Sequence, residues 1–306
     1  MRALVIGAGF ISQHLVKKLI ELDYEVIIYQ RNETSLAHVE TIHGDIRNSS
    51  LIRKTLLKVQ PNIIFHLAAY KERTREPQYF HQAFEANLLA TQTILTICCE
   101  LQSLQALIVM GTAEEYGDTN SPPFVETLRE QPNSVYSLSK VCQTYLCQTY
   151  HRLYKLPVVV LRPSIVYGPE QGQDMFLPAL ILSLLRNKNF SMTKGEQTRD
   201  FIFVDDLINV MLLATKNLQA RGEVINIASG KAIRLEFLAK YVAKLLMKEE
   251  FLQVDALPYR KNEIFNYSVD ISKACELLNW IPKTSFESGL EKTINYYKNL
   301  LLGFKL

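Results

Sequence analysis

Short, continuous apolar runs alternate with helix-like segments through the first half of the chain. The apolar runs cover residues 3–6, 25–29, 62–67, 106–110 and 158–161, and the helix-like segments cover residues 10–22, 51–59, 82–101 and 134–154. Strands that are apolar throughout and alternate with helices are typical of a parallel sheet covered on both faces. The pattern therefore predicts an α/β protein with a doubly wound parallel sheet of the Rossmann type.

This alternation ends near Pro169. The rest of the chain contains a helix-like segment at 177–186, an expected hairpin around Gly195, a strand-like run at 224–228 and a mostly helical end. No internal repeat or low-complexity linker divides the sequence. We expect residues 1–168 to form the sheet domain, with the strand near 224–228 returning to it. Residues 169–306 are expected to form mainly a smaller α/β lobe packed against that domain.

The composition excludes several classes of protein. With 306 residues, of which 48% are hydrophobic, the chain can bury one large core or two modest ones. A net charge of +3 without a basic, aromatic-rich cluster argues against nucleic acid and membrane surfaces as partners. No apolar run is long enough to cross a bilayer, and a strand-like run opens the chain without a charged leader, so we expect a cytoplasmic protein. Five cysteines without metal-ligand spacing predict buried thiols and no metal site.

A glycine-containing turn joins the first apolar run to the first helix-like segment. In VIGAGFIS, residues 5–12, Gly7 and Gly9 occupy the first two positions of G-x-G-x-x-G, and Ser12 occupies the third. Such a turn lets the backbone approach a pyrophosphate, which then lies at the N-terminus of the following helix. A glycine turn that binds nothing is the alternative, but the position between strand and helix favours a dinucleotide site.

The residues after the second apolar run bear on the choice of dinucleotide. An acid usually ends this strand and bonds the adenosine ribose, but here the run is followed by Gln30-Arg31-Asn32. Arg31 can pair with a 2′-phosphate, so we favour NADP(H), with NAD(H) as the alternative if Arg31 is only solvated. Farther along, Asp45 is expected to accept a hydrogen bond from the adenine amino group, unless it serves only a turn.

A tyrosine and a lysine lie four residues apart in the helix-like segment at 134–154. Tyr136 and Lys140 therefore share one face of that helix. A phenol is a poor base near neutral pH because its pKa is about 10, and a neighbouring ammonium lowers that pKa. Thr112 follows the apolar run at 106–110, at the sheet edge where ligands bind. We expect its hydroxyl to orient a substrate oxygen towards Tyr136.

Further motifs follow one another over nearly the whole chain. They are GAGFIS at 7–12, GDI at 44–46, HLAA at 66–69, NLLAT at 87–91, GTAEEYG at 111–117, YSLSK at 136–140, LRPSIVYGP at 161–169, RDFIFVDDL at 199–207 and LNWIPKTSFESGL at 278–290. In this ordered set the chain resembles the extended short-chain dehydrogenases/reductases, in the branch of nucleotide-sugar epimerases, dehydratases and reductases. The resemblance implies an NAD(P)-binding Rossmann domain and a second lobe that binds a nucleotide sugar.

The resemblance also implies a role for each matching residue. Tyr136 would exchange the proton on a sugar hydroxyl or ketone, Thr112 would bond the same oxygen, and Lys140 would hold the nicotinamide ribose. The cofactor-binding residues that it implies, together with those discussed above, are Gly7, Gly9, Phe10, Ile11, Arg31, Asn32, Asp45, Ile46, Leu67, Ala68, Ala69, Asn87, Tyr136, Lys140, Pro163 and Ser164.

On the substrate side, the resemblance implies that Arg199 and Arg260 clamp a diphosphate through their forked donors. Glu263 would bond the nucleotide ribose, and Glu114 would lie near the sugar. The alternatives are an exposed hairpin cation at Arg199 and a solvated pair at Arg260 and Glu263. The family motif also differs at Ile165, which stands where an asparagine is usual, so one expected polar contact to the substrate is in doubt. Ala90 replaces a common glycine. Helices equivalent to residues 82–101 and 134–154 pair in the family, which implies a homodimer.

The residues after Thr112 distinguish among the family's reactions. Dehydratases carry an acid pair there, whereas this chain has Ala113 followed by Glu114. A methyl group cannot protonate a leaving hydroxide, so 4,6-dehydration is disfavoured. Our leading hypothesis is NADPH-dependent reduction of a nucleotide-linked 4-keto-6-deoxyhexose at C4, for polysaccharide synthesis. The alternative is an NAD-dependent UDP-sugar 4-epimerase; a 4,6-dehydratase and a dinucleotide-binding regulator without catalysis are less favoured.

Overall fold

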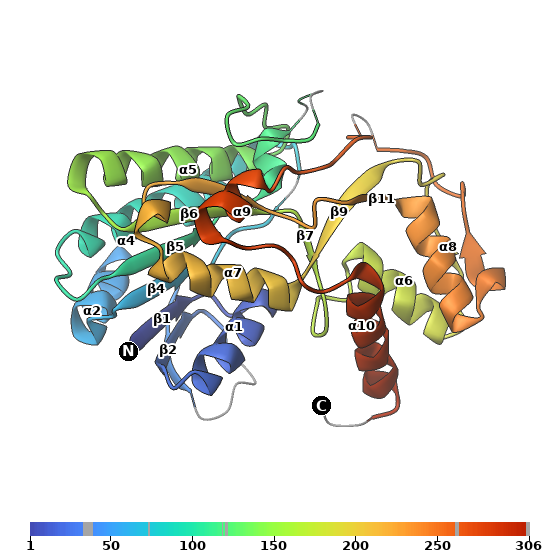
Figure 1. Ribbon diagram of the computed structural model, residues 1–306, viewed down its shortest axis with the longest axis horizontal. Coiled ribbons are helices and arrows are strands. Elements are labelled where there is room, and N and C mark those ends of the chain that lie inside the picture. The colour runs from blue at the N-terminus through green and yellow to red at the C-terminus, as the bar shows by residue number, and fades with distance from the viewer. Residues whose placement is uncertain (33–38, 73, 118, 120–121, 261–262, 304–306) are drawn as a thin grey trace.

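The computed structural model describes residues 1–303, apart from residues 33–38, 73, 118, 120–121 and 261–262. Its main sheet has seven strands in the order β10-β6-β5-β4-β1-β2-β3, and every neighbouring pair is parallel. These strands are β1 (Arg2–Ile6), β2 (Glu25–Gln30), β3 (Glu40–His43), β4 (Ile63–His66), β5 (Ala106–Met110), β6 (Val158–Pro163) and β10 (Val224–Ile227). The predicted doubly wound α/β fold is confirmed (Figure 1).

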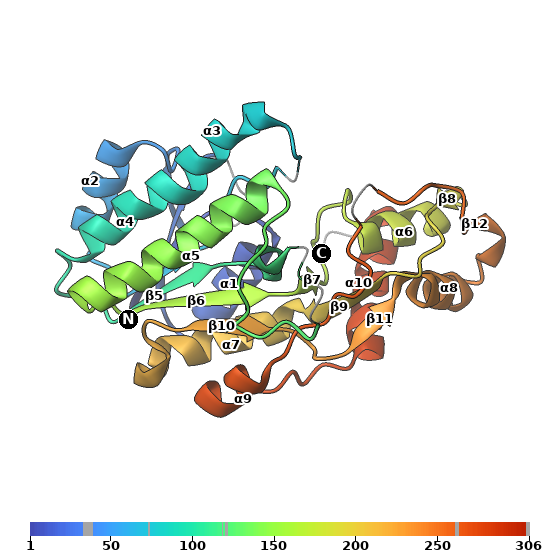
Figure 2. The ribbon, with the colours of Figure 1, turned by 90° about the horizontal axis from the view of Figure 1, so that it is seen from above.

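Helices cover both faces of this sheet (Figure 2). One face carries α2 (Ser49–Val59), α4 (Ala90–Cys98) and α5 (Val135–Tyr154), and the other carries α1 (Phe10–Glu21) and α7 (Val204–Lys216). Alternate residues of the central strands enter two separate apolar clusters, one under each helical layer. Because the central strands are buried on both faces, their sequences are continuously apolar rather than alternating.

The helix predicted at 82–101 contains a change of winding. Helix α3 (Phe80–Ala83) passes into a π-helical segment, η2 (Phe84–Leu89), which continues into α4 without leaving helical backbone angles. Single π turns inside α-helices often mark functional sites. Asn87 lies in this segment and is fully buried. The segment therefore places a polar side chain inside the layer that covers the sheet.

The remaining elements form a second lobe beside the sheet (Figures 1 and 2). Its strands make a three-stranded sheet, β11-β9-β7, and a two-stranded sheet, β12-β8. They are β7 (Ile165–Tyr167), β8 (Phe190–Ser191), β9 (Thr198–Phe203), β11 (Ala232–Arg234) and β12 (Leu252–Gln253), with helices α6 (Phe176–Leu185), α8 (Leu235–Leu246) and α10 (Phe286–Leu301). Helix α9 (Ser272–Leu278) packs on β10 of the main sheet. The predicted domain boundary at residue 168 stays a prediction. Helices α7 and α9 and strand β10 follow that residue in the sequence, yet they lie beside or within the main sheet.

The hairpin expected around Gly195 is wrong. Strand β8 pairs in parallel with β12, and β9 pairs with β7 and β11, so β8 and β9 are not partners. Gly195 has a φ of +76°, and a Cβ there would lie 2.6 Å from the backbone nitrogen of Glu236. The glycine therefore serves a close approach to the first turn of α8 instead of a hairpin turn.

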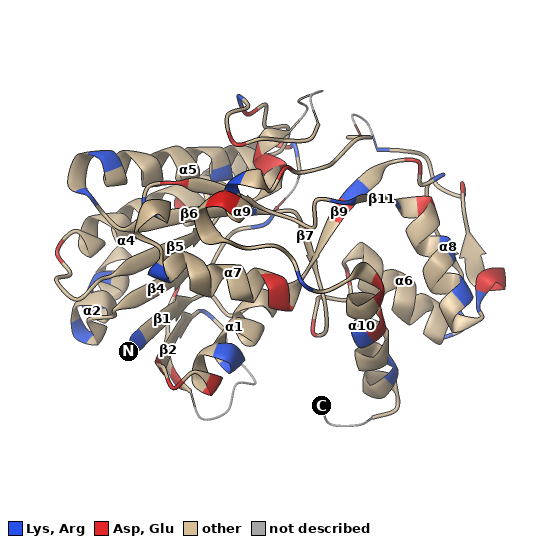
Figure 3. Cartoon of the chain, viewed as in Figure 1, with Lys and Arg blue, Asp and Glu red and all other residues tan. Residues whose placement is uncertain are grey.

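Charged side chains of both signs are interspersed over the view of Figure 3. Among the residues that the structure describes, no helix combines the length and apolar content needed to cross a bilayer. Within the same residues, no three His, Cys, Asp or Glu side chains gather as a metal site would require.

Candidate active site

The carboxyl ends of β1, β4 and β5 meet where the strand order reverses, which is the usual ligand crevice of such sheets. Gly7 follows β1 with a φ of +103°, and a Cβ there would lie 2.7 Å from the backbone nitrogen of Ala68, which follows β4. A Cβ on Gly9 would meet no atom within 4 Å. Gly9 is also the N-cap of α1 and has no side chain to bond the first N–H groups of the helix. The turn thus offers open space and free donors to an anion such as a pyrophosphate.

A buried amide marks the end of β2. Gln30 is only 4% exposed, and neither its side-chain oxygen nor its side-chain nitrogen has a hydrogen-bond partner among the described residues. A buried polar group without a partner is costly, which fits a position that a ligand completes. Arg31, next to it, is exposed. Sequence reasoning noted the missing acid here and overlooked the glutamine that replaces it.

Asp45, predicted near the adenine, is engaged by the protein itself. Its carboxylate accepts hydrogen bonds from Nε and Nη2 of Arg47, at 3.0 and 2.8 Å. These bonds from Arg47 lower the pKa of Asp45 to about 2. Its backbone oxygen accepts from the hydroxyl of Tyr29 at 2.9 Å. The contact of Asp45 with adenine stays a prediction. The adenine amino group would have to bond a carboxylate that already accepts hydrogen bonds from Arg47.

Asn87 joins two elements around the predicted nicotinamide end. Its Oδ1 accepts from the backbone N–H of Tyr70 at 2.7 Å, and its Nδ2 donates to the carbonyl of Tyr70 and to the hydroxyl of Ser139, both at 2.9 Å. This amide ties the segment after β4 to helix α5. The contacts give Asn87 a structural task; its predicted proximity to the cofactor stays a prediction.

The three predicted catalytic residues come from two neighbouring elements. Thr112 follows β5 and caps a 3₁₀ turn, η3 (Ala113–Tyr116), which packs against helix α5. Tyr136 and Lys140 lie one turn apart at the start of α5, where the hydroxyl of Ser134 accepts from the N–H of Ser137 at 3.0 Å. Thr112, Tyr136 and Lys140 are 8%, 7% and 2% exposed. The fold therefore brings these side chains to one buried edge of the sheet.

Lys140 is held in place on the protein side of this edge. Its Nζ donates to the carbonyl of Met110 and to Oε1 of Gln143. Burial lowers the pKa of Lys140 to about 8, although the carboxylate of Glu115 acts in the opposite direction. The group thus remains mostly an ammonium near neutral pH, which is the state that stabilises a neighbouring phenolate.

A histidine that sequence reasoning did not select completes the surroundings of Lys140. The hydroxyl of Thr91 donates to the carbonyl of Asn87 at 2.7 Å, accepts from Nε2 of Gln143 at 2.7 Å and lies 2.8 Å from Nε2 of His66. Burial, and then the charge of Lys140, lower the pKa of His66 to about 3. His66 is therefore neutral and adds no charge to the site.

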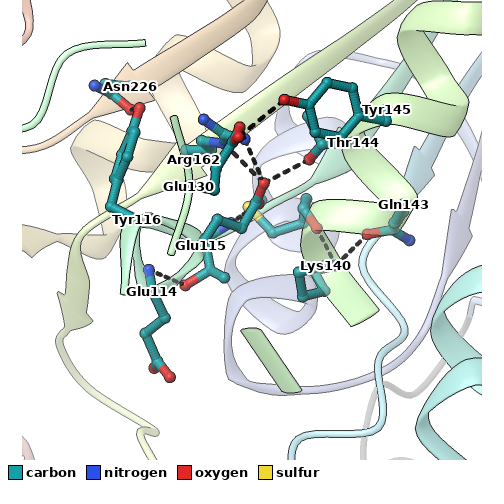
Figure 4. A network of polar contacts seen from close by, with 12 residues as sticks. Glu114, Glu115, Tyr116, Glu130, Lys140, Gln143, Thr144, Tyr145, Arg162 and Asn226 are labelled. Carbon is teal, nitrogen blue, oxygen red and sulfur yellow. Dashed lines mark hydrogen bonds and ion pairs between the residues drawn. The ribbon is translucent and has the colours of Figure 1, made fainter. Parts of the chain in front are cut away.

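Two adjacent glutamates in η3 have different surroundings (Figure 4). Glu115 is fully buried and points to Arg162, whereas Glu114 is half-buried and points away from that pair. Sequence reasoning considered Glu114 and passed over Glu115. Only the identity of Arg162, a cation in an otherwise apolar strand, signals that a buried acid must lie nearby.

Ala113 lies in a third apolar cluster below η3. The cluster joins the turn to residues of the second half of the chain, and its members are Ala113, Tyr116, Phe124, Ala228, Tyr267 and Val269. Ala113 is 0% exposed. Its methyl group packs in this cluster, so the position offers no acid.

The predicted substrate residues lie in the second lobe. Arg199, on β9, pairs with Glu263, and its Nη1 donates to the carbonyls of Thr198 and Ile264 at 2.7 Å each. Its guanidinium also lies 5.8 Å from the ring centre of Tyr267. The structure thus brings Arg199 and Glu263 together, while Arg260 is exposed on the same loop. The alternative of an exposed cation at Arg199 does not hold, since only 16% of its side chain is accessible.

The predicted cofactor residues of the next strand lie at its end. Pro163 is the last residue of β6, and Ser164 follows it, buried, with its N–H bonded to the carbonyl of Ile227 at 2.8 Å. Ile165, where an asparagine was expected, starts β7 and is half-buried. The same sheet edge therefore carries the ends of β1, β4, β5 and β6.

Comparison with known proteins agrees with this geometry. The model of the NAD dependent epimerase/dehydratase family matches residues 3–228. A human dTDP-D-glucose 4,6-dehydratase is 30% identical over 95% of this chain and 88% of its own. The structure of UDP-glucose 4-epimerase from Thermotoga maritima with UDP-glucose superposes with a TM-score of 0.91 at 27% identity, over 98% of this chain and all of the other. UDP-glucuronic acid 4-epimerase from Bacillus cereus, in complex with UDP-glucuronic acid and NAD, has a TM-score of 0.88 at 30% identity, with the same coverage.

Proposed function

The chain belongs to the NAD dependent epimerase/dehydratase family, and from this premise we propose that it reduces a nucleotide-linked 4-keto-6-deoxyhexose at C4 with NADPH. The coarser part of this statement, an NAD(P)-dependent enzyme that modifies a nucleotide sugar, follows from the family and its relatives. The choice of reaction and of NADPH rests on residues of this chain, in η3 and at the end of β2.

Tyr136 is the proton donor in this proposal. The bound NADPH would supply the hydride, and Tyr136 would give its proton to the alkoxide that forms at C4. The hydroxyl of Thr112 would hold the same oxygen. Lys140, an ammonium near neutral pH, would hold the ribose next to the nicotinamide and stabilise the phenolate that remains.

The observation that carries the choice of reaction is the apolar burial of Ala113. Elimination of water from C5 and C6 requires an acid at the departing hydroxyl. Ala113 lies in an apolar cluster with Tyr116 and Phe124, and it provides no proton. This supports a reaction at C4 alone. Gln30 and Arg31, in place of an acid at the end of β2, support NADPH because they do not repel a 2′-phosphate.

A second candidate is an NAD-dependent UDP-sugar 4-epimerase. It is supported by the likeness to the two 4-epimerases, one of which was crystallised with NAD. Tyr136 would then take the proton of the C4 hydroxyl as the C4 hydride passes to NAD, and would return it after the sugar has rotated and the hydride comes back to the opposite face, while Thr112 would hold the oxygen. The cofactor would stay bound, and no external reductant would be consumed.

The second lobe would bind the nucleotide. Arg199 and Arg260 would bond the diphosphate, and Glu263 would bond the ribose. The ion pair between Arg199 and Glu263 would then either separate or persist while both side chains also bond the ligand. Glu114, half-buried beside the turn, would face the sugar. Each of these contacts is part of the proposal.

We also propose a homodimer through α4 and α5. Large apolar side chains are exposed on this helical layer, among them Leu89, Tyr145, Leu153 and Tyr154. A two-fold arrangement would cover them with the same face of a second copy. Light scattering at micromolar concentration tests this, and a monomer would contradict it.

The decisive experiment follows NADPH absorbance with a panel of 4-keto-6-deoxyhexoses linked to UDP, dTDP or GDP. Oxidation of NADPH with one of them, lost in Tyr136→Phe, would support the reductase. No oxidation with any of them, together with NAD retained through purification and conversion of a UDP-hexose at C4, would favour the epimerase. Dinucleotide binding without turnover in either assay would favour a binding protein.

A further inference from the structure

One carboxylate connects the three elements that surround the predicted reaction site. Oε1 of Glu115 accepts from the backbone N–H of Thr112 at 2.9 Å. Oε2 accepts from the hydroxyl of Thr144 on α5 at 2.7 Å and from Nε of Arg162 on β6 at 2.8 Å. Thr144 lies one turn beyond Lys140 on the same helix. Figure 4 shows the carboxylate of Glu115 between helix α5 and Arg162.

The chain keeps a space for this carboxylate. Gly111 lies between β5 and Thr112, and a Cβ there would lie 2.7 Å from Oε1 of Glu115 and 3.1 Å from the carbonyl of Leu161. Any other residue at 111 would force the carboxylate, or the neighbouring strand, to move. The glycine of the turn therefore accommodates Glu115, in addition to any role in approaching a ligand.

The buried charges around Glu115 balance one another. Arg162 also bonds Glu130, with 2.6 Å between Nη2 and Oε1, and its guanidinium carbon lies 5.0 Å from the ring centre of Tyr116. The side chains of Arg162, Glu115 and Glu130 are 1%, 0% and 9% exposed, and Lys140 is 2% exposed. Two buried cations thus share the interior with two buried anions. Glu115 is the anion common to both cations, since it bonds Arg162 and acts electrostatically on Lys140.

We propose that Glu115 is a positioning residue: fixed by Arg162 and Thr144, its carboxylate sets the backbone of Thr112 against helix α5 and supplies the counter-charge of the Lys140 ammonium. The roles of Thr112, Tyr136 and Lys140 in catalysis belong to the proposed function. The link from Glu115 to them does not depend on which reaction they serve. Glu115 itself touches neither cofactor nor substrate, because it is fully enclosed.

The titration of Lys140 reports on this link. Besides its own burial, the charged groups that act on it are Glu115, which raises its pKa, and Lys71, which lowers it; Cys147 would raise it only as a thiolate. His66 on β4 is neutral, and Cys147 stays a thiol because burial raises its pKa to about 12. Glu115 is thus the one carboxylate among the groups that shift Lys140. Without the charge of Glu115, the Lys140 ammonium should lose its proton at a lower pH.

The test compares Glu115→Gln with Glu130→Gln. Each substitution removes one carboxylate bonded to Arg162, and only the first removes a charge that acts on Lys140 and bonds Thr112. Lys140 is titrated by NMR in protein labelled with isotopic lysine, with Lys140→Met identifying its resonance. We expect its pKa to fall by about one unit in Glu115→Gln and not to move in Glu130→Gln. This readout needs no substrate, so it stands even if the proposed reaction is wrong.

Kinetics then test the positioning of Thr112. With the substrate identified for the enzyme, Glu115→Gln should lower kcat by about 10²-fold at unchanged KM, while Glu130→Gln keeps kcat. An unmoved pKa of Lys140 in Glu115→Gln, or equal losses of kcat in the two variants, would overturn the proposal. If Glu115→Gln does not fold, the double variant Glu115→Gln/Arg162→Met, which also removes the guanidinium that has lost a carboxylate, should show the same fall in pKa.

Discussion

Replacing Arg162 by methionine would test how the buried charges at this site are balanced. The side chain is 1% exposed and bonds two carboxylates, those of Glu115 and Glu130. Methionine matches its length and apolar stem and removes every donor. Two buried carboxylates would then lose the guanidinium that bonds them both. The expected result is a loss of stability together with a reversal of its pH dependence.

The size of the loss follows from the burial of the pair. Removing one partner of a buried ion pair costs about 3–5 kcal/mol, because the remaining charge stays desolvated. For a chain of 306 residues, an unfolding entropy of about 2.1 cal/mol/K per residue gives about 0.64 kcal/mol/K in total. The melting temperature should therefore fall by about 5–8 °C near neutral pH.

The pH dependence has opposite signs in the two proteins. In the wild type, burial raises the pKa of Glu130, but the bonds and charge of Arg162 outweigh burial, and the pKa lies below its ordinary 4.5. That contribution to stability is present above the unfolded pKa and is lost as the pH falls through the folded one. In Arg162→Met, burial is opposed only by the bonds that Glu130 accepts from Tyr145 and from its own backbone, so the pKa of Glu130 should rise above its ordinary value. The variant should then be most stable near pH 4–5 and lose stability as the pH rises, by about 1.4 kcal/mol per unit.

Thermal unfolding followed by circular dichroism between pH 4 and about pH 8 measures both effects. Arg53→Met is the matched control, because Arg53 also bonds a carboxylate through two nitrogens, that of Glu100, at 2.8 Å for each bond, but about half of each side chain is exposed. We expect little change in this control. If Arg162→Met melts within 2 °C of the wild type over the whole range (~1 kcal/mol), the reasoning about buried charge is refuted.

Four variants test the proposed cofactor and catalytic residues. Gly7→Ala should lower the free energy of unfolding by about 1–2 kcal/mol, because the φ of +103° and the approach to 2.7 Å from Ala68 strain any side chain there. Gly9→Ala, whose Cβ would meet no atom within 4 Å, should keep the wild-type melting temperature. It should nevertheless weaken NADPH binding in a fluorescence titration. The double variant Gln30→Asp/Arg31→Ser should shift the ratio of the Kd values for NADPH and NADH towards NADH by about tenfold, or about 1.4 kcal/mol, since a carboxylate repels a 2′-phosphate; an unchanged ratio would contradict the assignment. Tyr136→Phe should lower kcat by about 10²–10⁴-fold at unchanged dinucleotide affinity, and a variant that keeps wild-type turnover would exclude Tyr136 as the proton donor.

The strands that the sequence predicts are those buried on both faces. Each of β1, β2, β4, β5 and β6 lies at a continuous apolar run, and the late run at 224–228 forms β10. Strand β3 (Glu40–His43) was missed, since it lies at the sheet edge, is partly exposed and contains Glu40 and His43. The turn at Gly195 was misread because a glycine with positive φ fits a hairpin and a close helix contact equally well. Local pattern does not separate these two cases.

The candidate site divides in a similar way. Motifs with fixed spacing, such as Tyr136 and Lys140 or Gly7 and Gly9, can be placed from the sequence because the helix or turn alone sets their geometry. The bonds of Glu115 to Arg162 and to Thr144 join residues 47 and 29 positions apart, so they exist only in the folded chain. Gln30 was overlooked for a different reason: its importance lies in its side chain having no hydrogen-bond partner among the residues that the structure describes. A sequence does not display an unsatisfied group.

The π-helical segment at Phe84–Leu89 holds one residue more than an α-helical turn would, because its hydrogen bonds run from residue i to residue i+5. In an α-helix each residue advances the side-chain direction by about 100°. Removing one residue from the π-helical segment would leave an ordinary α-helical turn and keep the direction of Thr91, Ile94 and Leu95, whereas removing one residue from α4 itself would turn the residues beyond it out of the core. Single-residue deletions should therefore be tolerated better in the π-helical segment than in α4 among descendants of the sequence.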